Sequence, residues 1–212
     1  MRHLNSVDQF ILQSDHALRT IFGKPSTTER SNPSNDIQEQ NLSDTERKLS
    51  SSLMRVNHSG EVSAQALYQG QALTARLEEV RHSMERAAEE ENDHLAWTEQ
   101  RLMELSSHKS VLNPLWYAGS FAIGAIAGLL GDKWSLGFVA ETEHQVIRHL
   151  DSHLQQLPEA DLRSKAVLQQ MKIDEAHHAT VALEGGGAEL PWPVKKLMTG
   201  MSKVMTSSAY YV

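Results

Sequence analysis

The sequence contains no cysteine. This absence excludes disulfide bonds, a thiol nucleophile, iron–sulfur clusters and rubredoxin-type iron, and it fits a reducing compartment. Basic residues are also in the minority: 20 Lys and Arg stand against 27 Asp and Glu, so the net charge is -7. That balance argues against a nucleic-acid-binding surface. The first residues after Met1 lack the apolar run of a secretory signal, and we therefore expect a protein on the cytosolic side.

Two Glu-x-x-His motifs lie in register with apolar helix faces. They are Glu91/His94 and Glu175/His178. Residues three apart share one face of an α-helix, so each motif directs a carboxylate and an imidazole to one point. The apolar residues on these faces are Met84, Ala87, Ala88, Leu95 and Leu102 for the first motif, and Leu168, Met171, Ala179 and Ala182 for the second. Both pairs are therefore predicted to point into a core.

Two further matches to the Glu-x-x-His motif lie on polar helix faces. Glu79/His82 shares its face with Arg76, Ser83 and Arg86, a pattern typical of a solvated surface. Glu141/His144 also lies on a polar face, with Gln145 and Arg148, whereas Glu143 is aligned with Leu136, Val139, Ala140, Ile147 and Leu150. Glu143 is therefore the inward residue of that stretch.

Glu143 and Glu61 are lone carboxylates on apolar faces. Such a group costs several kcal/mol unless it is paired, protonated or bound to a metal. Glu61 precedes Glu91 by 30 positions and Glu143 precedes Glu175 by 32, so the second half of the chain repeats the first. Each half has the length of an antiparallel helix pair, and two pairs make a four-helix bundle.

The bundle would bring four Glu and two His together. Four carboxylates balance two divalent ions, and one imidazole per metal suits iron or manganese better than zinc. The alternative is six buried polar residues that satisfy one another without metal; the mutual repulsion of the carboxylates disfavours it. Glu90 and Asp174 each precede a ligand Glu, and we expect them to accept hydrogen bonds from the metal-bound imidazoles of another helix.

The remaining chain divides at residue 42. Residues 4–22 have the spacing of an amphipathic helix, and residues 24–41 are so polar that we expect a mobile linker. Bundle helices are predicted from a capping box at Ser43 to about residue 75, over 78–105, over 134–156, and from 159 to the glycines at 185–187. The predicted domains are thus 1–42, an N-terminal helix and polar linker, and 43–212, the metal-binding bundle.

Residues 111–131 carry no charge. Their length would span a bilayer, but a single crossing would separate the two halves of the metal site, so we expect the stretch to dip into one membrane face, with packing over the bundle as the alternative. A C-terminal amphipathic helix after Pro193 carries Lys195, Lys196 and Lys203 and suits either an anionic lipid surface or a cap on the bundle.

Four segments resemble a known family, the demethoxyubiquinone hydroxylases of ubiquinone biosynthesis. They are residues 55–61 (RVNHSGE), 90–94 (EENDH), 139–143 (VAETE) and 174–178 (DEAHH), and the likeness extends over about 43–212. The resemblance implies an all-α, ferritin-like four-helix bundle with an added apolar membrane-facing helix and N- and C-terminal helices. Carried over, the iron ligands are Glu61, Glu91, His94, Glu143, Glu175 and His178, and His149 is a histidine kept near the iron.

The resemblance also implies an activity. It is that of a di-iron monooxygenase that hydroxylates the ring of a 2-polyprenyl-3-methyl-6-methoxy-1,4-benzoquinol with O2, on the cytoplasmic face of a bacterial cell membrane as a peripheral protein. An electron donor is implied, and a homodimer or a complex of ubiquinone-biosynthesis enzymes stays open. Two other classes use the same ligands, namely ferroxidases that handle iron and di-iron quinol oxidases. A storage cage gives no reason for the uncharged stretch at 111–131.

Overall fold

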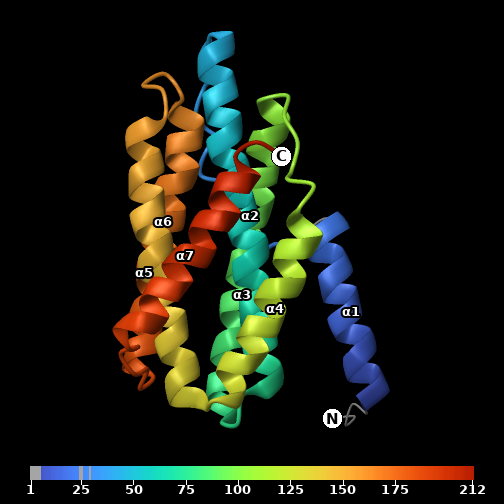
Figure 1. Cartoon of the computed structure of the whole chain (residues 1–212). Coiled ribbons are helices and arrows are strands. Elements are labelled where there is room, and N and C mark those ends of the chain that lie inside the picture. Colours follow the sequence, from blue (N-terminus) through green and yellow to red (C-terminus); the bar gives the residue numbers. More distant parts are fainter. Residues whose placement is uncertain (1–5, 24–25, 29) are drawn as a thin grey trace.

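The computed structural model describes residues 6–23, 26–28 and 30–212, and the elements assigned in that part of the chain are all α-helices (Figure 1). The predicted all-α class is confirmed. In chain order the helices are α1 Ser6–Phe22, α2 Asp44–Thr74, α3 Glu78–Glu104, α4 Asn113–Leu129, α5 Asp132–Gln156, α6 Leu162–Glu184 and α7 Trp192–Ala209.

Four of these helices form the bundle. α2 packs on α3 and α5 packs on α6, and the two pairs meet where α3 contacts α6 and α2 contacts α5. The predicted capping box starts α2: the Ser43 side chain accepts from the Glu46 backbone, and the Glu46 carboxylate accepts from Ser43. Apolar clusters fill two levels of the interior, one around Leu53 and Leu168 and the other around Met84 and Val139. The buried polar residues of the bundle are held between rigid, packed helices.

The uncharged stretch folds as α4, which lies along α2. A Cβ added at Gly124 would stand 2.2 Å from the carbonyl oxygen of Leu67, and one at Gly70 would stand 2.3 Å from that of Phe121. The two backbones therefore touch, and side chains at these glycines would prevent the approach. Among the described residues, no helix has both the length and the apolar character needed to cross a membrane.

The segment that we expected to be a mobile linker lies against the bundle. We call residues 26–28 and 30–42 the N-terminal strap. The Asn32 amide donates to Gln100 (2.9 Å), and Glu39 accepts from the buried guanidinium of Arg101 (2.6 Å). Arg101 also donates to Asp161 (2.8 Å). The expectation of a mobile linker was therefore wrong: its polar side chains have partners on α3 and on α6, which composition does not reveal.

The C-terminal helix α7 crosses the bundle on the same side as α4 (Figure 1). Its Lys195 forms ion pairs with Glu189 (3.1 Å) and with Glu141 of α5 (3.5 Å). Two expectations change as a result. Glu141, predicted on a polar face, is buried beneath α7, and Lys195 faces the protein, whereas Lys196 lies over the Trp192 ring at 5.5 Å.

Candidate metal centre

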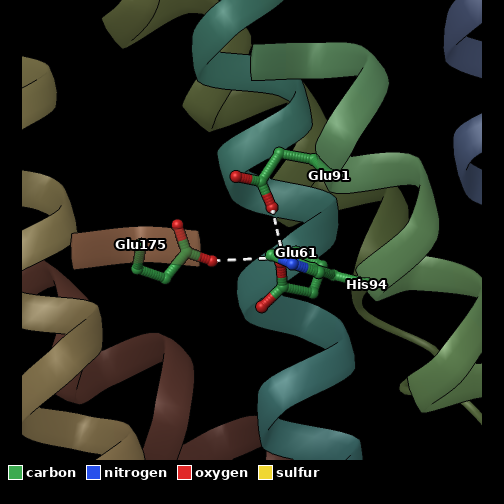
Figure 2. Close-up of side chains that lie close together, drawn as sticks. All are labelled: Glu61, Glu91, His94 and Glu175. Atoms are coloured by element: carbon green, nitrogen blue, oxygen red, sulfur yellow. Dashed lines mark hydrogen bonds and ion pairs between the residues drawn. The ribbon is translucent and has the colours of Figure 1, made fainter. Parts of the chain in front are cut away.

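The structure brings together all six residues that the sequence singled out. α2 supplies Glu61, α3 supplies Glu91 and His94, α5 supplies Glu143, and α6 supplies Glu175 and His178, and every one is buried. Ligand atoms of Glu61, Glu91, His94 and Glu175 all lie within 4.8 Å of one another. Figure 2 shows these four side chains converging from three helices.

His94 forms the centre of one half of the site. Its Nδ1 lies 3.2 Å from Glu91 Oε2, 3.2 Å from Glu175 Oε1 and 3.4 Å from Glu61 Oε2. An imidazole nitrogen and three carboxylate oxygens from separate side chains thus face one point. This is a donor set that suits a divalent metal ion.

His178 forms the centre of the other half. Its Nδ1 lies 3.1 Å from Glu175 Oε2 and 3.3 Å from Glu91 Oε1. Glu91 and Glu175 therefore each turn one oxygen to His94 and the other to His178. Glu143 completes this half: one of its oxygens accepts a hydrogen bond from the phenol of Tyr68, whose ring lies edge-on to His178 at 6.3 Å.

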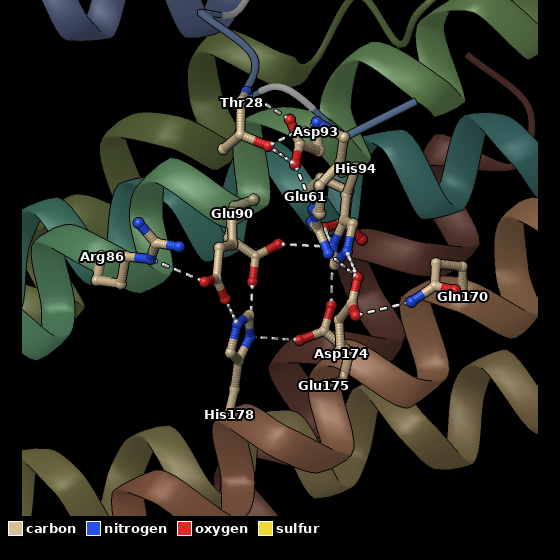
Figure 3. Close-up of polar contacts among 12 residues, drawn as sticks. Thr28, Glu61, Arg86, Glu90, Asp93, His94, Gln170, Asp174, Glu175 and His178 are labelled. Atoms are coloured by element: carbon tan, nitrogen blue, oxygen red, sulfur yellow. Dashed lines mark hydrogen bonds and ion pairs between the residues drawn. The ribbon is translucent and has the colours of Figure 1, made fainter. Parts of the chain in front are cut away.

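A second carboxylate holds the far side of each imidazole. His94 Nε2 lies 2.9 Å from Asp174 Oδ2, and His178 Nε2 lies 2.7 Å from Glu90 Oε2 (Figure 3). These are the two contacts between helices that we expected from the sequence. Through its hydrogen bond, His178 lowers the pKa of Glu90 to about 2. Such carboxylates fix the ring orientation and leave the Nδ1 atoms directed at the centre.

The six residues satisfy one another only in part. Burial and then the charge of Glu91 raise the pKa of Glu61, and burial and then the charge of Glu175 raise the pKa of Glu143. Buried atoms Glu61 Oε2, Glu91 Oε1 and Glu143 Oε2 have no hydrogen-bond partner. Carboxylates crowded together with unpartnered oxygens are costly without a cation, so the residues present fit a metal cluster.

The two discarded motifs lie outside this cluster. Glu79 and His82 are exposed on α3, and His144 is exposed on α5. His149, the further candidate, packs against His153 with a ring-centroid distance of 3.9 Å, and its buried Nε2 has no hydrogen-bond partner. A role for His149 near a metal stays a prediction.

Sequence reasoning missed three residues around the site. Tyr68 lies on the same helix as Glu61, and its neighbours in the sequence do not indicate a partner on another helix. Arg30 and Thr28 belong to the strap, where no periodicity points to a position. They contact Asp93 and Asp174, immediately beside His94 and Glu175.

The fold and the site together define a class. In ferritin-like bundles with dinuclear metal centres, two helices each give a Glu and two give a Glu-x-x-His pair, all projecting inward. The chain has this arrangement. It belongs to the family of the ubiquinone biosynthesis protein COQ7, which matches residues 48–209.

Curated relatives extend the likeness over the whole chain. A protein of Nitrosococcus oceani named 3-demethoxyubiquinol 3-hydroxylase is 61% identical over 211 residues, covering 100% of this chain and 99% of the relative. Proteins of the same name from Nitrosomonas eutropha (58% identical, covering 98% of this chain and 99% of the relative) and Pseudomonas fluorescens (56%, covering 100% and 98%) are similar as well.

Proposed function

We propose that this chain is a di-iron monooxygenase that hydroxylates the ring of 3-demethoxyubiquinol, the compound in the names of its relatives, with O2. The observation that carries the proposal is the convergence of four buried carboxylates and two oriented imidazoles with oxygens left unpartnered. The names of the relatives favour hydroxylation over iron handling or quinol oxidation, the two alternatives that the ligands leave open.

In the proposed site, the six ligands would serve two ions. Glu91 and Glu175, which face both imidazoles, would be shared. Glu61 and His94 would belong to one ion, and Glu143 and His178 to the other. Four carboxylates neutralise the charge of two ferrous ions, so the buried site would carry little net charge.

When bound, the iron pair supplies the activation of O2 and the transfer of one oxygen atom to the ring. The protein provides the surroundings for this chemistry. Asp174 and Glu90 keep both imidazoles turned inward, and Tyr68 holds Glu143 in place. The six ligands are buried among packed helices, so bulk water is kept from the reacting atoms.

A quinol with a polyprenyl tail resides in a bilayer, and one side of the molecule suits a bilayer surface. α4 and α7 lie on this side and expose large apolar residues, which we call the apolar surface: Leu115, Ile126, Leu129 and Leu130 at α4, and Trp192, Leu197, Met201 and Val204 on α7. Many large apolar residues exposed on one side of a protein indicate an interaction site. We propose that the chain is a peripheral membrane protein that rests on one leaflet through this surface.

Mass spectrometry of cellular quinones tests the activity. Cells that lack this protein should accumulate demethoxyubiquinone and lose ubiquinone. The wild-type chain should restore ubiquinone, and Glu143→Ala should not, although it is made in equal amount. Unchanged quinones in the deletion strain, or full rescue by Glu143→Ala, would refute the proposal.

A further inference from the structure

The N-terminal strap reaches the candidate metal centre through Arg30. Its Nη1 donates to Asp174 Oδ2 at 2.8 Å, and this same oxygen lies 2.9 Å from His94 Nε2. Its Nε donates to Asp93 Oδ2 at 2.7 Å. The guanidinium therefore joins α3 and α6 at the level of the His94 half of the site.

Further contacts fix the strap at this point. The Thr28 backbone N–H donates to Asp93 Oδ1 (2.8 Å) and its hydroxyl to Asp93 Oδ2 (2.7 Å), as Figure 3 shows. Asp93 is fully buried. The Arg30 guanidinium also lies over the Trp97 ring at 5.1 Å, and this ring packs against His94. A buried carboxylate with several donors from one segment is a specific attachment point.

The two halves of the site show why this contact matters. Glu90, which holds His178, accepts from Arg86 four residues earlier on the same helix (2.9 Å). Asp174, which holds His94, has Gln170 at the corresponding position, and that neutral amide donates at 2.9 Å. In the His94 half, the cation comes from Arg30 of the strap. The strap thus supplies the positive charge that α6 lacks at Gln170, the position that corresponds to Arg86 of α3.

We infer that Arg30 is a positioning residue: it holds the Asp174 carboxylate against His94 and thereby makes the strap a working part of the His94 half of the metal centre. The inference rests on the proposed di-iron site. Without Arg30, Asp174 keeps only Gln170 as a donor beside His94. The carboxylate is then held less firmly, and so is the orientation of the His94 ring.

Iron release tests this inference without using turnover. Protein loaded with two ferrous ions is mixed with excess chelator, and the two release phases are followed. Arg30→Ala should speed one phase about tenfold, the lower end of the effect of removing an outer partner of a metal ligand. Arg30→Lys should release iron at a rate between those of Arg30→Ala and the wild type, since an ammonium keeps the charge but lacks the two-donor fork. Arg86→Ala should speed the other phase.

The control is Glu39→Gln, which loosens the strap at Arg101, away from the site. It should leave both phases and the Mössbauer spectrum unchanged, whereas Arg30→Ala should alter one of two iron-57 doublets. Wild-type release in Arg30→Ala, equal acceleration of both phases, or the same change in Glu39→Gln would overturn the inference. If Arg30→Ala fails to fold, Arg30→Lys is compared with the wild type: faster release in one phase supports the inference, and unchanged release overturns it. Absence of iron binding in the wild type would instead refute the di-iron proposal.

Discussion

The phenol of Tyr68 donates a hydrogen bond to a carboxylate oxygen of Glu143, between α2 and α5. Both side chains are buried. Burial and then the charge of Glu143 raise the pKa of Tyr68, so the phenol keeps its proton and serves as a donor. The other oxygen of Glu143 has no hydrogen-bond partner, and the contact leaves it free for a metal.

Removal of this hydroxyl should therefore weaken the His178 half of the site. Tyr68→Phe keeps the ring, and we expect a loss of about tenfold in iron affinity and in turnover. Tyr117→Phe is the matched control: Tyr117 makes the same kind of bond, to Gln69, away from the six ligands. It should cost about 1 kcal/mol of stability and leave iron binding unchanged. Iron titration of both variants decides, and wild-type affinity in Tyr68→Phe would contradict the expected role.

The helices and the six clustered residues could be predicted because helical periodicity is local. The predicted ranges 78–105 and 134–156 compare with α3 Glu78–Glu104 and α5 Asp132–Gln156. The inward direction of Glu143 followed from its apolar neighbours. The contact of Tyr68 with Glu143 joins residues 75 positions apart, and Arg30 reaches Asp174 across 144. Nothing near either residue in the sequence marks such a partner, because tertiary packing sets it.

The docking of α4 on α2 predicts opposite effects on stability for two Gly→Ala substitutions in α4. Gly124→Ala places a methyl group against the Leu67 carbonyl, and we expect a loss of about 1–3 kcal/mol in the free energy of unfolding. Gly119→Ala, on the same helix, meets no atom within 4 Å and should gain about 0.5–1 kcal/mol from helix propensity. Urea unfolding measures both. Equal effects would mean that α4 does not lie on α2 at this distance.

Attachment to a membrane should be mainly hydrophobic. Burial of an exposed Leu contributes about 1.5–3 kcal/mol, against about 1 kcal/mol for each cation near an anionic surface. Because Lys195 is paired with Glu141 and Glu189, Lys196 and Lys203 are the cations of α7 left to contribute. High salt should release little protein from vesicles.

The double variant Leu129→Glu with Leu130→Glu should release much more protein and keep its iron, since both residues are exposed and neither is a proposed ligand. It should also lose more turnover with a long-tailed quinol than with a tail-less analogue. Vesicle sedimentation and assays on both substrates check these outcomes. Full release by salt, or equal losses on the two substrates, would count against the proposed apolar surface.

Acid should destabilise the metal-free protein through His58. Burial, and then the charge of Lys109, lower the pKa of this imidazole from 6.5 to about 3. As the pH falls below 6.5, the unfolded chain takes up a proton that the folded protein does not, so stability declines by about 1.4 kcal/mol per pH unit. His58→Gln should reduce the slope of unfolding free energy against pH by one proton between pH 6 and about 4. If chelator-treated wild type and His58→Gln had the same slope of unfolding free energy against pH, His58 would be protonated in the folded protein.

Iron content per chain is the most direct measurement of the central claim. The purified wild-type protein should hold about two iron ions. Glu143→Ala and His178→Ala should lower that number, because each removes a proposed ligand that faces the buried centre. Glu79→Ala and His144→Ala, which change exposed members of the two discarded motifs, should bind as much iron as the wild type. Elemental analysis of these five proteins gives the answer: equal iron in all five, or a loss in the Glu79 variant as large as in the Glu143 variant, would contradict the assignment of the site.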